Sequence, residues 1–336
     1  MLRGLYFNQM TVPDQKPKTA ANLPPAIFLM GPTASGKSGV ALEIARHLPV
    51  EIISVDSAQV YRHMNIGTAK PSAETLAAVP HHLIDLIDPH ERYSAAQFRD
   101  DALTAMRKIT ERGHIPLLVG GTMLYFRALL EGLSELPAAD SSVRMVIDSM
   151  AAERGWPALH QQLQQLDPAS ALRIKASDSQ RIQRALEVYY LTDKPMSEIL
   201  KKPKYVYLPY QVTHIALIPS ERETLHQRIT QRFDEMLELG LIGEVRTIRD
   251  KFGLDADSPA MRCVGYRQVG MYLNKEVSLD EMRAMGLAAT RQLAKRQLTW
   301  LRPMQGLQEF DCLAQDLAQQ VLEYLRAGGL QAAAAC

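Results

Sequence analysis

The sequence predicts an α/β fold, in which a parallel β-sheet is flanked by helices and interrupted by a helical insertion. Short apolar runs alternate with helical stretches along much of the chain, and this alternation is typical of parallel sheets. Between residues 138 and 208 the pattern changes to one helix after another, rich in Gln, Arg and Lys. A single insertion within an α/β core is the simplest explanation of both patterns.

Five apolar runs are the candidate strands of this sheet. They are residues 26–30, 52–55, 83–87, 117–119 and 214–218. Unbroken apolar runs of this length are typical of strands that are buried on both faces. Residues 39–47 and 95–112 are expected to form helices between the strands.

The expected domain organisation separates core, insertion and tails. Residues 26–137 and 209–326 form the α/β core with its C-terminal helices, and residues 138–208 form the insertion. Residues 1–25 and 327–336 are expected to be loose tails, because the first contains four prolines among polar residues and the second is rich in Gly and Ala. The first tail lacks the basic and apolar regions of a secretory signal.

Composition excludes several classes of protein. Hydrophobic residues make up 46% and charged residues 22% of the 336 positions, which excludes wholesale disorder, collagen and a coiled coil. No apolar run reaches the roughly 18 residues that a membrane span needs. The net charge of +1 gives no global sign of nucleic-acid binding. The three cysteines have no metal-binding or redox spacing, which fits a cytoplasmic protein.

The segment Gly31–Ser38 reads GPTASGKS and matches the phosphate-loop pattern G-x-x-x-x-G-K-[ST] at every position. It follows a predicted strand and opens a predicted helix, as that pattern requires. Glycines let the backbone curve around an anion, and loop N–H groups point toward phosphate. Lys37 adds a positive charge, and the Ser38 hydroxyl can bind Mg²⁺. The motif predicts a P-loop NTPase-like core, without saying which di- or triphosphate it binds.

An enzyme that uses ATP would need a further acidic residue at a strand end to hold the metal. Asp85 or Asp88, in the apolar run after His82, is a candidate for that position. Neither has an obvious catalytic partner nearby in the sequence. The sequence therefore carries only part of what an NTPase needs.

Polar residues follow two further predicted strands. Asp56, Ser57, Ala58 and Gln59 come directly after the second strand, and Thr122 follows another after two glycines. Ligands of open α/β sheets bind at the carboxyl ends of strands, so we expect these residues beside the phosphate loop. A carboxylate near bound phosphate has to bind metal or take a proton from a substrate. A helix cap explains Asp56 equally well, and a plain tight turn explains Thr122.

Several further motifs appear along the chain. They are DSAQVY at Asp56–Tyr61, GTAKP at Gly67–Pro71, HHLID at His81–Asp85, VGGTMLY at Val119–Tyr125, QRALE at Gln183–Glu187, RCVGYRQ at Arg262–Gln268 and KRQLTWLR at Lys295–Arg302. With the phosphate loop, this set resembles the bacterial tRNA dimethylallyltransferases, the isopentenyl-tRNA transferase family. The resemblance extends from about Ala26 to Pro303, with no departure inside the motifs.

The resemblance implies that the phosphate loop holds dimethylallyl diphosphate and does not turn over ATP. The dimethylallyl group would go to the N6 amine of the adenosine 3′-adjacent to the tRNA anticodon, and diphosphate would leave with Mg²⁺ as helper. Residues implied to hold the diphosphate are Gly31, Pro32, Thr33, Ala34, Ser35, Gly36, Lys37, Ser38 and Arg232, with Arg228 as the alternative to Arg232. Asp56 would accept a proton from the amine, and Thr122 and Lys37 complete the catalytic group.

The resemblance also implies contacts with the anticodon stem-loop of tRNA. The residues are Asp56, Ser57, Ala58, Gln59 and Thr122 at strand ends, Arg144, Gln180, Arg181, Ile182, Gln183 and Arg184 in the insertion, and Arg262, Cys263, Val264, Gly265, Tyr266, Arg267, Lys295, Arg296, Gln297, Leu298, Thr299, Trp300, Leu301 and Arg302. Residues 173–204 contain eight Lys or Arg against four Asp or Glu, and residues 262–302 contain eight against three. Contacts to RNA phosphates need such patches, although solvated helix faces also carry them.

Other functions stay open on the residues alone. An adenylate isopentenyltransferase would share the phosphate loop and Asp56 without needing the two basic patches, an ATP-dependent small-molecule kinase would transfer phosphate, and an RNA-binding protein would not catalyse. We expect a cytoplasmic monomer that does not enter a membrane. His81 and His82 are expected to be buried or capping residues, because adjacent strand side chains point to opposite faces. Trp156 and Trp300 are expected in the core.

Overall fold

The computed structural model describes residues 23–201 and 208–330, so that most of the two predicted tails lies outside the described residues. The chain divides into two compact units, one formed by residues 1–126 and 209–336 and the other by residues 127–208. The second unit therefore begins at Arg127, earlier than the predicted residue 138. The division falls inside helix α4 (Met123–Glu131).

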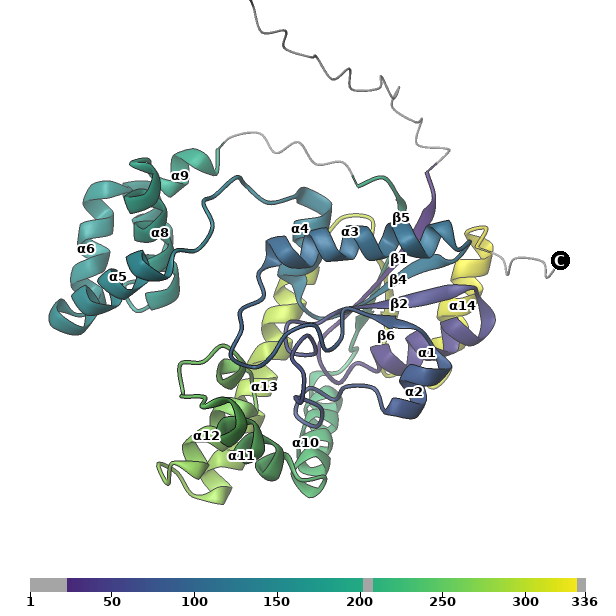
Figure 1. Ribbon diagram of the computed structural model, residues 1–336. Helices are drawn as coiled ribbons and strands as arrows, with labels where there is room; N and C mark the ends of the chain where they lie inside the picture. The colour runs from purple at the N-terminus through teal and green to yellow at the C-terminus, as the bar shows by residue number, and fades with distance from the viewer. Residues whose placement is uncertain (1–22, 202–207, 331–336) are drawn as a thin grey trace, which may run out of the picture. The chain divides into compact units, whose positions relative to one another are not determined.

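A parallel sheet forms the centre of the first unit (Figure 1), with the strand order β3-β2-β4-β1-β5-β6. The strands are β1 (Pro25–Met30), β2 (Val50–Val55), β3 (His81–His82), β4 (Ile115–Gly120), β5 (Gln211–Ile218) and β6 (Gln308–Asp311). The register aligns Met30 of β1 and Val55 of β2 with Gly120 of β4, so that these three strands end at one edge. The predicted α/β class is confirmed.

Helices cover both faces of the sheet. The helices of this unit are α1 (Lys37–His47), α2 (Ala73–Ala78), α3 (Ala95–Glu111), α4, α10 (Arg222–Glu238), α11 (Leu241–Phe252), α12 (Tyr266–Leu273), α13 (Leu279–Leu301), α14 (Leu317–Ala327) and the 3₁₀ turn η2 (Ala260–Arg262). Ile27 and Leu29 of β1 share a core with α1 and α14. Phe28 points the other way and packs on Phe126 of α4, with ring centroids 5.2 Å apart. The alternation along β1 thus buries both faces.

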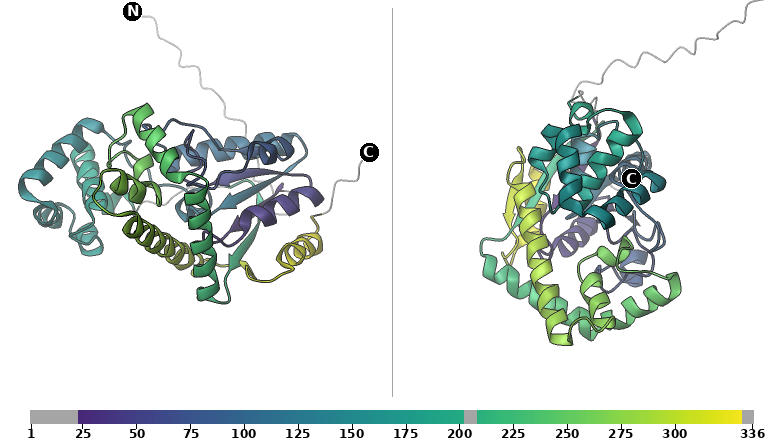
Figure 2. Two further views of the ribbon diagram at one scale, coloured as in Figure 1. Left: turned by 90° about the horizontal axis from the view of Figure 1, so that it is seen from below. Right: turned by 90° about the vertical axis from the view of Figure 1, so that its left-hand side faces the viewer.

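Helices α10 to α13 form a group below the strand ends in Figure 1, and the long helix α13 is seen side-on in Figure 2. Their core contains Phe233, Leu241 and Tyr266, and it also includes Val60 and Met64 from the segment that follows β2. Residues separated by more than 150 positions are therefore packed together. This packing attaches the Asp56 loop, which we define as residues 56–71, to the C-terminal helices.

The strands differ from the sequence-based expectations at several places. The run 83–87 is not a strand, because Leu83 and Asp85 have φ angles of 62° and 57°, which extended chain cannot adopt. Asp85 instead pairs with Lys70 at 2.6 Å and takes no place at a strand end. Strand β6 is short and polar, and no apolar run indicated it. The sheet also begins at Pro25, within the predicted tail.

Glu51, near the start of β2, is a buried carboxylate with three basic partners. Arg112 donates to it at 2.9 and 2.6 Å, His82 at 2.7 Å and His114 at 2.8 Å. The hydrogen bonds from Arg112 are the main cause that lowers the pKa of Glu51 to about 2. Within the described ranges, no cluster of three His, Cys, Asp or Glu side chains is suited to a metal ion. His82 thus takes part in the ion cluster around Glu51.

The second unit is a helical bundle. Its helices are α5 (Ser141–Arg154), α6 (Trp156–Leu166), α7 (Pro168–Arg173), α8 (Ser179–Thr192) and α9 (Met196–Ile199). Ile147, Leu159 and Ile182 lie in its core, against which Trp156 packs. Across the part of the chain that the structure covers, no helix is long and apolar enough to span a membrane.

Candidate active site

The phosphate loop, Gly31–Ser38, joins the end of β1 to the start of α1. Ala34 and Gly36 have φ angles of 63° and 79°, and these left-handed residues curve the backbone. A Cβ at Gly31 would lie 2.9 Å from the carbonyl oxygen of Leu217, so the close passage past β5 needs a glycine there. The loop has the anion-binding shape that its sequence predicts.

Lys37 is turned back onto its own loop. Its Nζ donates to the Pro32 carbonyl at 2.6 Å and to Ser35 Oγ at 3.4 Å. Burial, and after it the charge of Arg232, lowers the pKa of Lys37 to about 7, although Asp56 opposes the shift. A bound anion would stabilise the ammonium form and supply the charge partner that the loop lacks.

The two candidate arginines of α10 lie in different places. Arg228 Nη1 donates to the carbonyl of Cys312 at 2.8 Å, just after β6. Arg232 lines the cavity beside the phosphate loop. Burial lowers the pKa of Arg232, and the charge of Asp56 opposes this shift without cancelling it. Of the two, Arg232 is the residue available to an anion in the loop.

Asp56 follows β2 directly and lies next to the turn after β4. Its Oδ1 accepts hydrogen bonds from the N–H groups of Ala58 at 2.8 Å and Gln59 at 3.4 Å. Within residues 23–201 and 208–330, Oδ2 receives no hydrogen bond. Thr122 Oγ1 accepts from the Ser57 N–H at 3.0 Å and so ties β4 to the Asp56 loop. One oxygen of Asp56 therefore caps the turn, and the other is left for a substrate.

Glu244 of α11 holds the middle of the Asp56 loop. Its carboxylate accepts hydrogen bonds from the N–H groups of Asn65 at 2.9 Å, Ile66 at 2.8 Å and Gly67 at 3.2 Å. The Tyr266 hydroxyl donates to the same carboxylate at 2.5 Å. A Cβ at Gly67 would come within 2.4 Å of the Tyr266 ring. Two C-terminal helices thus fix this part of the loop.

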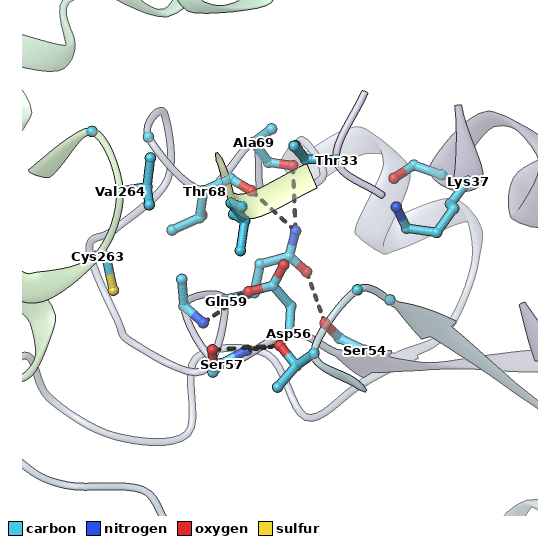
Figure 3. Close-up of a pocket in the computed structure, with 18 of the residues that line it drawn as sticks. Thr33, Lys37, Ser54, Asp56, Ser57, Gln59, Thr68, Ala69, Cys263 and Val264 are labelled. Carbon is cyan, nitrogen blue, oxygen red and sulfur yellow. Dashed lines mark hydrogen bonds between the residues drawn. The ribbon is translucent and has the colours of Figure 1, made fainter. Parts of the chain in front are cut away.

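Gln59 holds the same loop from the side of β2. Ser54 Oγ donates to Gln59 Oε1 at 2.8 Å, and Gln59 Nε2 donates to the carbonyls of Thr68 at 3.3 Å and Ala69 at 3.4 Å. Figure 3 shows this amide at the centre of the network. Both ends of the Gln59 amide are used by the protein, so the expected contact of this amide with a tRNA base is not supported by its geometry.

Gln297 of α13 joins the phosphate loop to the turn after β4. Its Oε1 accepts from the Thr33 N–H at 2.9 Å, and its Nε2 donates to the Gly121 carbonyl at 3.0 Å. Only 9% of the residue is exposed. The expected contact of Gln297 with tRNA stays a prediction, and in this structure its amide pairs with two backbone groups.

These elements surround one cavity of about 980 Å³ (Figure 3). Its lining includes Thr33, Ala34, Lys37, Ser38, Asp56, Ser57, Ala58, Gln59, Thr122, Arg232, Cys263, Val264, Gly265, Tyr266, Arg296, Gln297 and Trp300. Burial, and after it Asp56, raises the pKa of Cys263 to about 12, so this thiol is neutral. Lys37 and Arg232 line the cavity beside the phosphate loop, and Asp56 supplies a carboxylate from the Asp56 loop. The cavity is large enough to hold a small-molecule ligand.

Similarity to known proteins identifies the family of this chain. The sequence profile of the IPP transferases matches residues 59–304. The chain belongs to this family. It is 69% identical over 308 residues to the tRNA dimethylallyltransferase of Nitrosospira multiformis, covering 92% of this chain and 95% of that protein. Identity to the enzyme of the same name from Nitrosomonas europaea is 63% over 304 residues, covering 90% of this chain and 96% of that protein.

Solved structures of the IPP transferase family are similar as well. The tRNA isopentenylpyrophosphate transferase of Bacillus halodurans is 36% identical, with a TM-score of 0.66, and the match covers 91% of this chain and 96% of that one. A eukaryotic dimethylallyltransferase acting on tRNA is 27% identical, with a TM-score of 0.73, and the match covers 91% and 80%. The resemblance drawn from the motifs is confirmed.

Residues 295–302, at the C-terminal end of α13, are expected to contact tRNA. They divide between two faces. Arg296 and Trp300 line the cavity, whereas Lys295, Thr299 and Arg302 are exposed and do not. Leu298 is half-buried, and Leu301 is only 2% exposed, so a side-chain contact of Leu301 with RNA is wrong. Trp300 is 40% exposed, which contradicts its expected place in the core.

The segment Arg262–Arg267 supplies another wall of the cavity. Cys263, Val264 and Gly265 line it, and so does Arg262, which pairs with Asp257 at 3.2 Å. Tyr266 is 1% exposed, and its hydroxyl is paired with Glu244, so its role here is to support the loop. Arg267 is exposed and lies outside the cavity lining.

The insertion residues are engaged within their own unit. Arg144 Nε and Arg184 Nη1 donate to the buried Glu187 at 2.8 and 2.6 Å. Burial raises the pKa of Glu187, but these hydrogen bonds outweigh it and leave the pKa lowered. Ile182 is fully buried, so its expected contact with tRNA is wrong for the side chain. Arg144 and Arg184 thus have a structural role whether or not RNA approaches them.

The remaining insertion residues lie at the surface of the unit or near it. Gln180 is exposed, Arg181 pairs with Asp178 at 2.8 Å, and Gln183 donates to Asp148 at 2.6 Å.

Glu244, which holds the middle of the Asp56 loop, was not predicted from the sequence. Nothing in the helical pattern around it distinguishes it from a solvated surface glutamate.

Proposed function

We propose that the chain transfers a dimethylallyl group from dimethylallyl diphosphate to the N6 amine of the adenosine 3′-adjacent to the anticodon of tRNA, releasing diphosphate. The relatives named tRNA dimethylallyltransferase support this activity. The observation that supports it most directly is the cavity, which Lys37 and Arg232 line together with Asp56. Cations suit a diphosphate leaving group, and a carboxylate suits an attacking amine.

The donor side has to stabilise charge that develops on the leaving diphosphate. As the allylic C–O bond breaks, negative charge grows on the phosphate oxygens, and preorganised cations and N–H groups are suited to stabilise it. Lys37, Arg232 and the N–H groups of the phosphate loop can do this. Ser38 lines the cavity at the start of α1, and its hydroxyl would hold Mg²⁺ together with phosphate oxygens, since Mg²⁺ prefers oxygen ligands. When bound there, Mg²⁺ would supply further charge neutralisation.

The acceptor side has to orient a weakly nucleophilic amine and remove its proton. The free oxygen of Asp56 is suited to accept that proton, while its other oxygen keeps the carboxylate in place through the turn. Thr122 fixes Ser57 beside it. The adenine has to leave its stack to reach the cavity.

A single chain supplies the phosphate loop, Asp56 and Arg232 to the same cavity. For this reason we propose that the protein acts as a monomer, in the cytoplasm where its tRNA substrate is found. A second copy would not be needed to complete the site.

The direct test is incubation with dimethylallyl diphosphate, Mg²⁺ and unmodified tRNA, followed by nucleoside mass analysis. The proposal expects N6-dimethylallyladenosine at the position next to the anticodon and one diphosphate released for each group transferred. Parallel reactions offer AMP, ADP or ATP as acceptors, and labelled ATP as a phosphate donor. Prenylated free nucleotide without modified tRNA would indicate an adenylate isopentenyltransferase, and transfer of phosphate would indicate a kinase.

A further inference from the structure

Gln297 contacts both halves of the candidate active site with a single side chain. Its Oε1 accepts the Thr33 N–H of the phosphate loop at 2.9 Å, and its Nε2 donates to the Gly121 carbonyl at 3.0 Å. The neighbour of Gly121 is Thr122, whose hydroxyl holds the Ser57 N–H at 3.0 Å, beside Asp56. Three hydrogen bonds and two pairs of neighbouring residues thus connect the donor loop to the proposed base.

The surroundings leave this bridge little freedom. Gln297 is 9% exposed, and its helix is 23 residues long and anchored by the buried side chains of Ala294 and Leu301. A Cβ at Gly121 would lie 2.2 Å from Gln297 Nε2, so the turn is fitted closely to the amide. Both polar ends of Gln297 are hydrogen-bonded to backbone groups, one on each side of the site.

We propose that Gln297 is a positioning residue that sets the spacing between the phosphate loop and the turn after β4, and with it the alignment of the allylic carbon with the adenine amine. This inference rests on the proposed function. In aligned transfer the allylic C–O bond breaks, a C–N bond forms, and the amine proton passes to Asp56. If the amine is displaced, water takes its place: a C–O bond forms to give dimethylallyl alcohol, and water loses the proton.

The test measures how donor molecules divide between transfer and hydrolysis. Gln297→Met keeps the length of the side chain and removes both hydrogen bonds. We expect kcat for tRNA prenylation to fall about 10- to 100-fold, the range for small misplacements of reacting groups. We expect the dissociation constants of dimethylallyl diphosphate and tRNA to change less than about threefold, within about 0.7 kcal/mol. The fraction of consumed donor that becomes dimethylallyl alcohol should rise.

Gln292→Met is the matched control, because Gln292 is exposed on the same helix and should leave all of these values unchanged. Gly121→Ala disturbs the same bridge from its other end, and it is the variant to measure if Gln297→Met does not fold. The double variant should be no worse than the worse single variant, since both remove one alignment.

The inference would be overturned if a folded Gln297→Met or Gly121→Ala variant kept the wild-type kcat and the wild-type division of donor between transfer and hydrolysis. So would a loss of activity explained by weaker donor binding alone, which would make Gln297 only a brace for the phosphate loop. Wild-type protein that leaves tRNA unmodified would overturn the proposed function together with this inference. The reactions with wild-type protein therefore distinguish a failure of the proposed function from a failure of the Gln297 inference alone.

Discussion

The phosphate loop and the Asp56 loop line the same cavity but are held in different ways. The phosphate loop is shaped mainly from within, by Ser35 N–H to the Pro32 carbonyl, by Lys37 to the same carbonyl, and by the left-handed Gly36. Among the described residues, its one hydrogen bond with a distant side chain is donated by the Thr33 N–H to Gln297 Oε1. An anion site can therefore be encoded in eight consecutive residues.

The Asp56 loop depends on side chains from elsewhere in the fold. Glu244 and Tyr266 come from helices more than 170 residues later, and they hold its backbone on one side. Lys70 pairs with Asp85 and donates to the Tyr61 carbonyl at 2.9 Å. The part of the cavity that the Asp56 loop lines thus needs the assembled protein. Variants of the two loops should differ accordingly in what they disturb.

Asp56→Asn should have the largest effect on the rate. Asparagine keeps the turn-capping oxygen and removes the proton acceptor, so the chemical step should slow by about 100- to 10,000-fold. Binding of both substrates should change much less, because the amide can still contact the adenine amine. Single-turnover measurement with saturating tRNA and donor gives the rate. A rate within about threefold of wild type, where tenfold equals about 1.4 kcal/mol, would make Asp56 only a cap.

Lys37→Met should disturb the donor side alone. Removing one cation from the leaving group costs on the order of 3 kcal/mol, or about 150-fold in kcat/KM for dimethylallyl diphosphate. The affinity for tRNA should stay near that of wild type, because the Asp56 loop does not depend on Lys37. Steady-state kinetics with each substrate varied in turn checks this. Near-normal turnover at low donor concentration would contradict the assignment of the loop to the diphosphate.

The lowered pKa of Lys37 predicts how donor affinity depends on pH. With a pKa of about 7, the free ammonium loses its proton as the pH rises above that value. A bound diphosphate favours the charged form, so binding above pH 7 takes up a proton. The affinity should weaken between pH 7 and 9, by at most about tenfold per pH unit for a single proton. Calorimetry across this range measures it, and Lys37→Met should flatten the profile.

Glu244→Gln should disturb the acceptor side alone. An amide cannot accept from three N–H groups and a phenol as a carboxylate does, so the Asp56 loop should loosen. We expect KM for tRNA to rise about tenfold, equal to about 1.4 kcal/mol, with donor affinity unchanged. Asp250→Asn, at an exposed position of the same helix, is the control. Equal losses for both substrates would show that the two loops are not independent.

Lys295→Ala should have the smallest effect, because Lys295 lies outside the cavity lining. If it contacts a tRNA phosphate, the slope of log affinity against log salt concentration should fall by about one. Binding measured at several salt concentrations gives this slope. An unchanged slope would leave Lys295 on a solvated helix face.

The sequence was informative where the signal is local. The phosphate loop, strands β1, β2, β4 and β5, and the helical insertion follow from motifs or apolar runs of a few residues. The run 83–87 misled because left-handed backbone at Leu83 and Asp85 is not visible in composition. Strand β6 lies at the edge of the sheet, where it pairs with β5, and it has no apolar pattern. The roles of Glu244 and Gln297 depend on partners 177 and 264 residues away, and no local pattern encodes such partners.

The Glu51 cluster has a consequence for the opposite end of its strand. Sliding β2 by one residue would turn each side chain to the other face and withdraw Glu51 from Arg112, His82 and His114. The cluster therefore locks the register of the strand, and the register decides which residue emerges where β2 ends. The cluster at Glu51 thus decides that Asp56 is the residue that reaches the cavity, although Glu51 lies five residues, or about 17 Å, back along the strand. A single-residue insertion between Glu51 and Asp56 would force the chain to give up either the ion cluster or the carboxylate in the cavity.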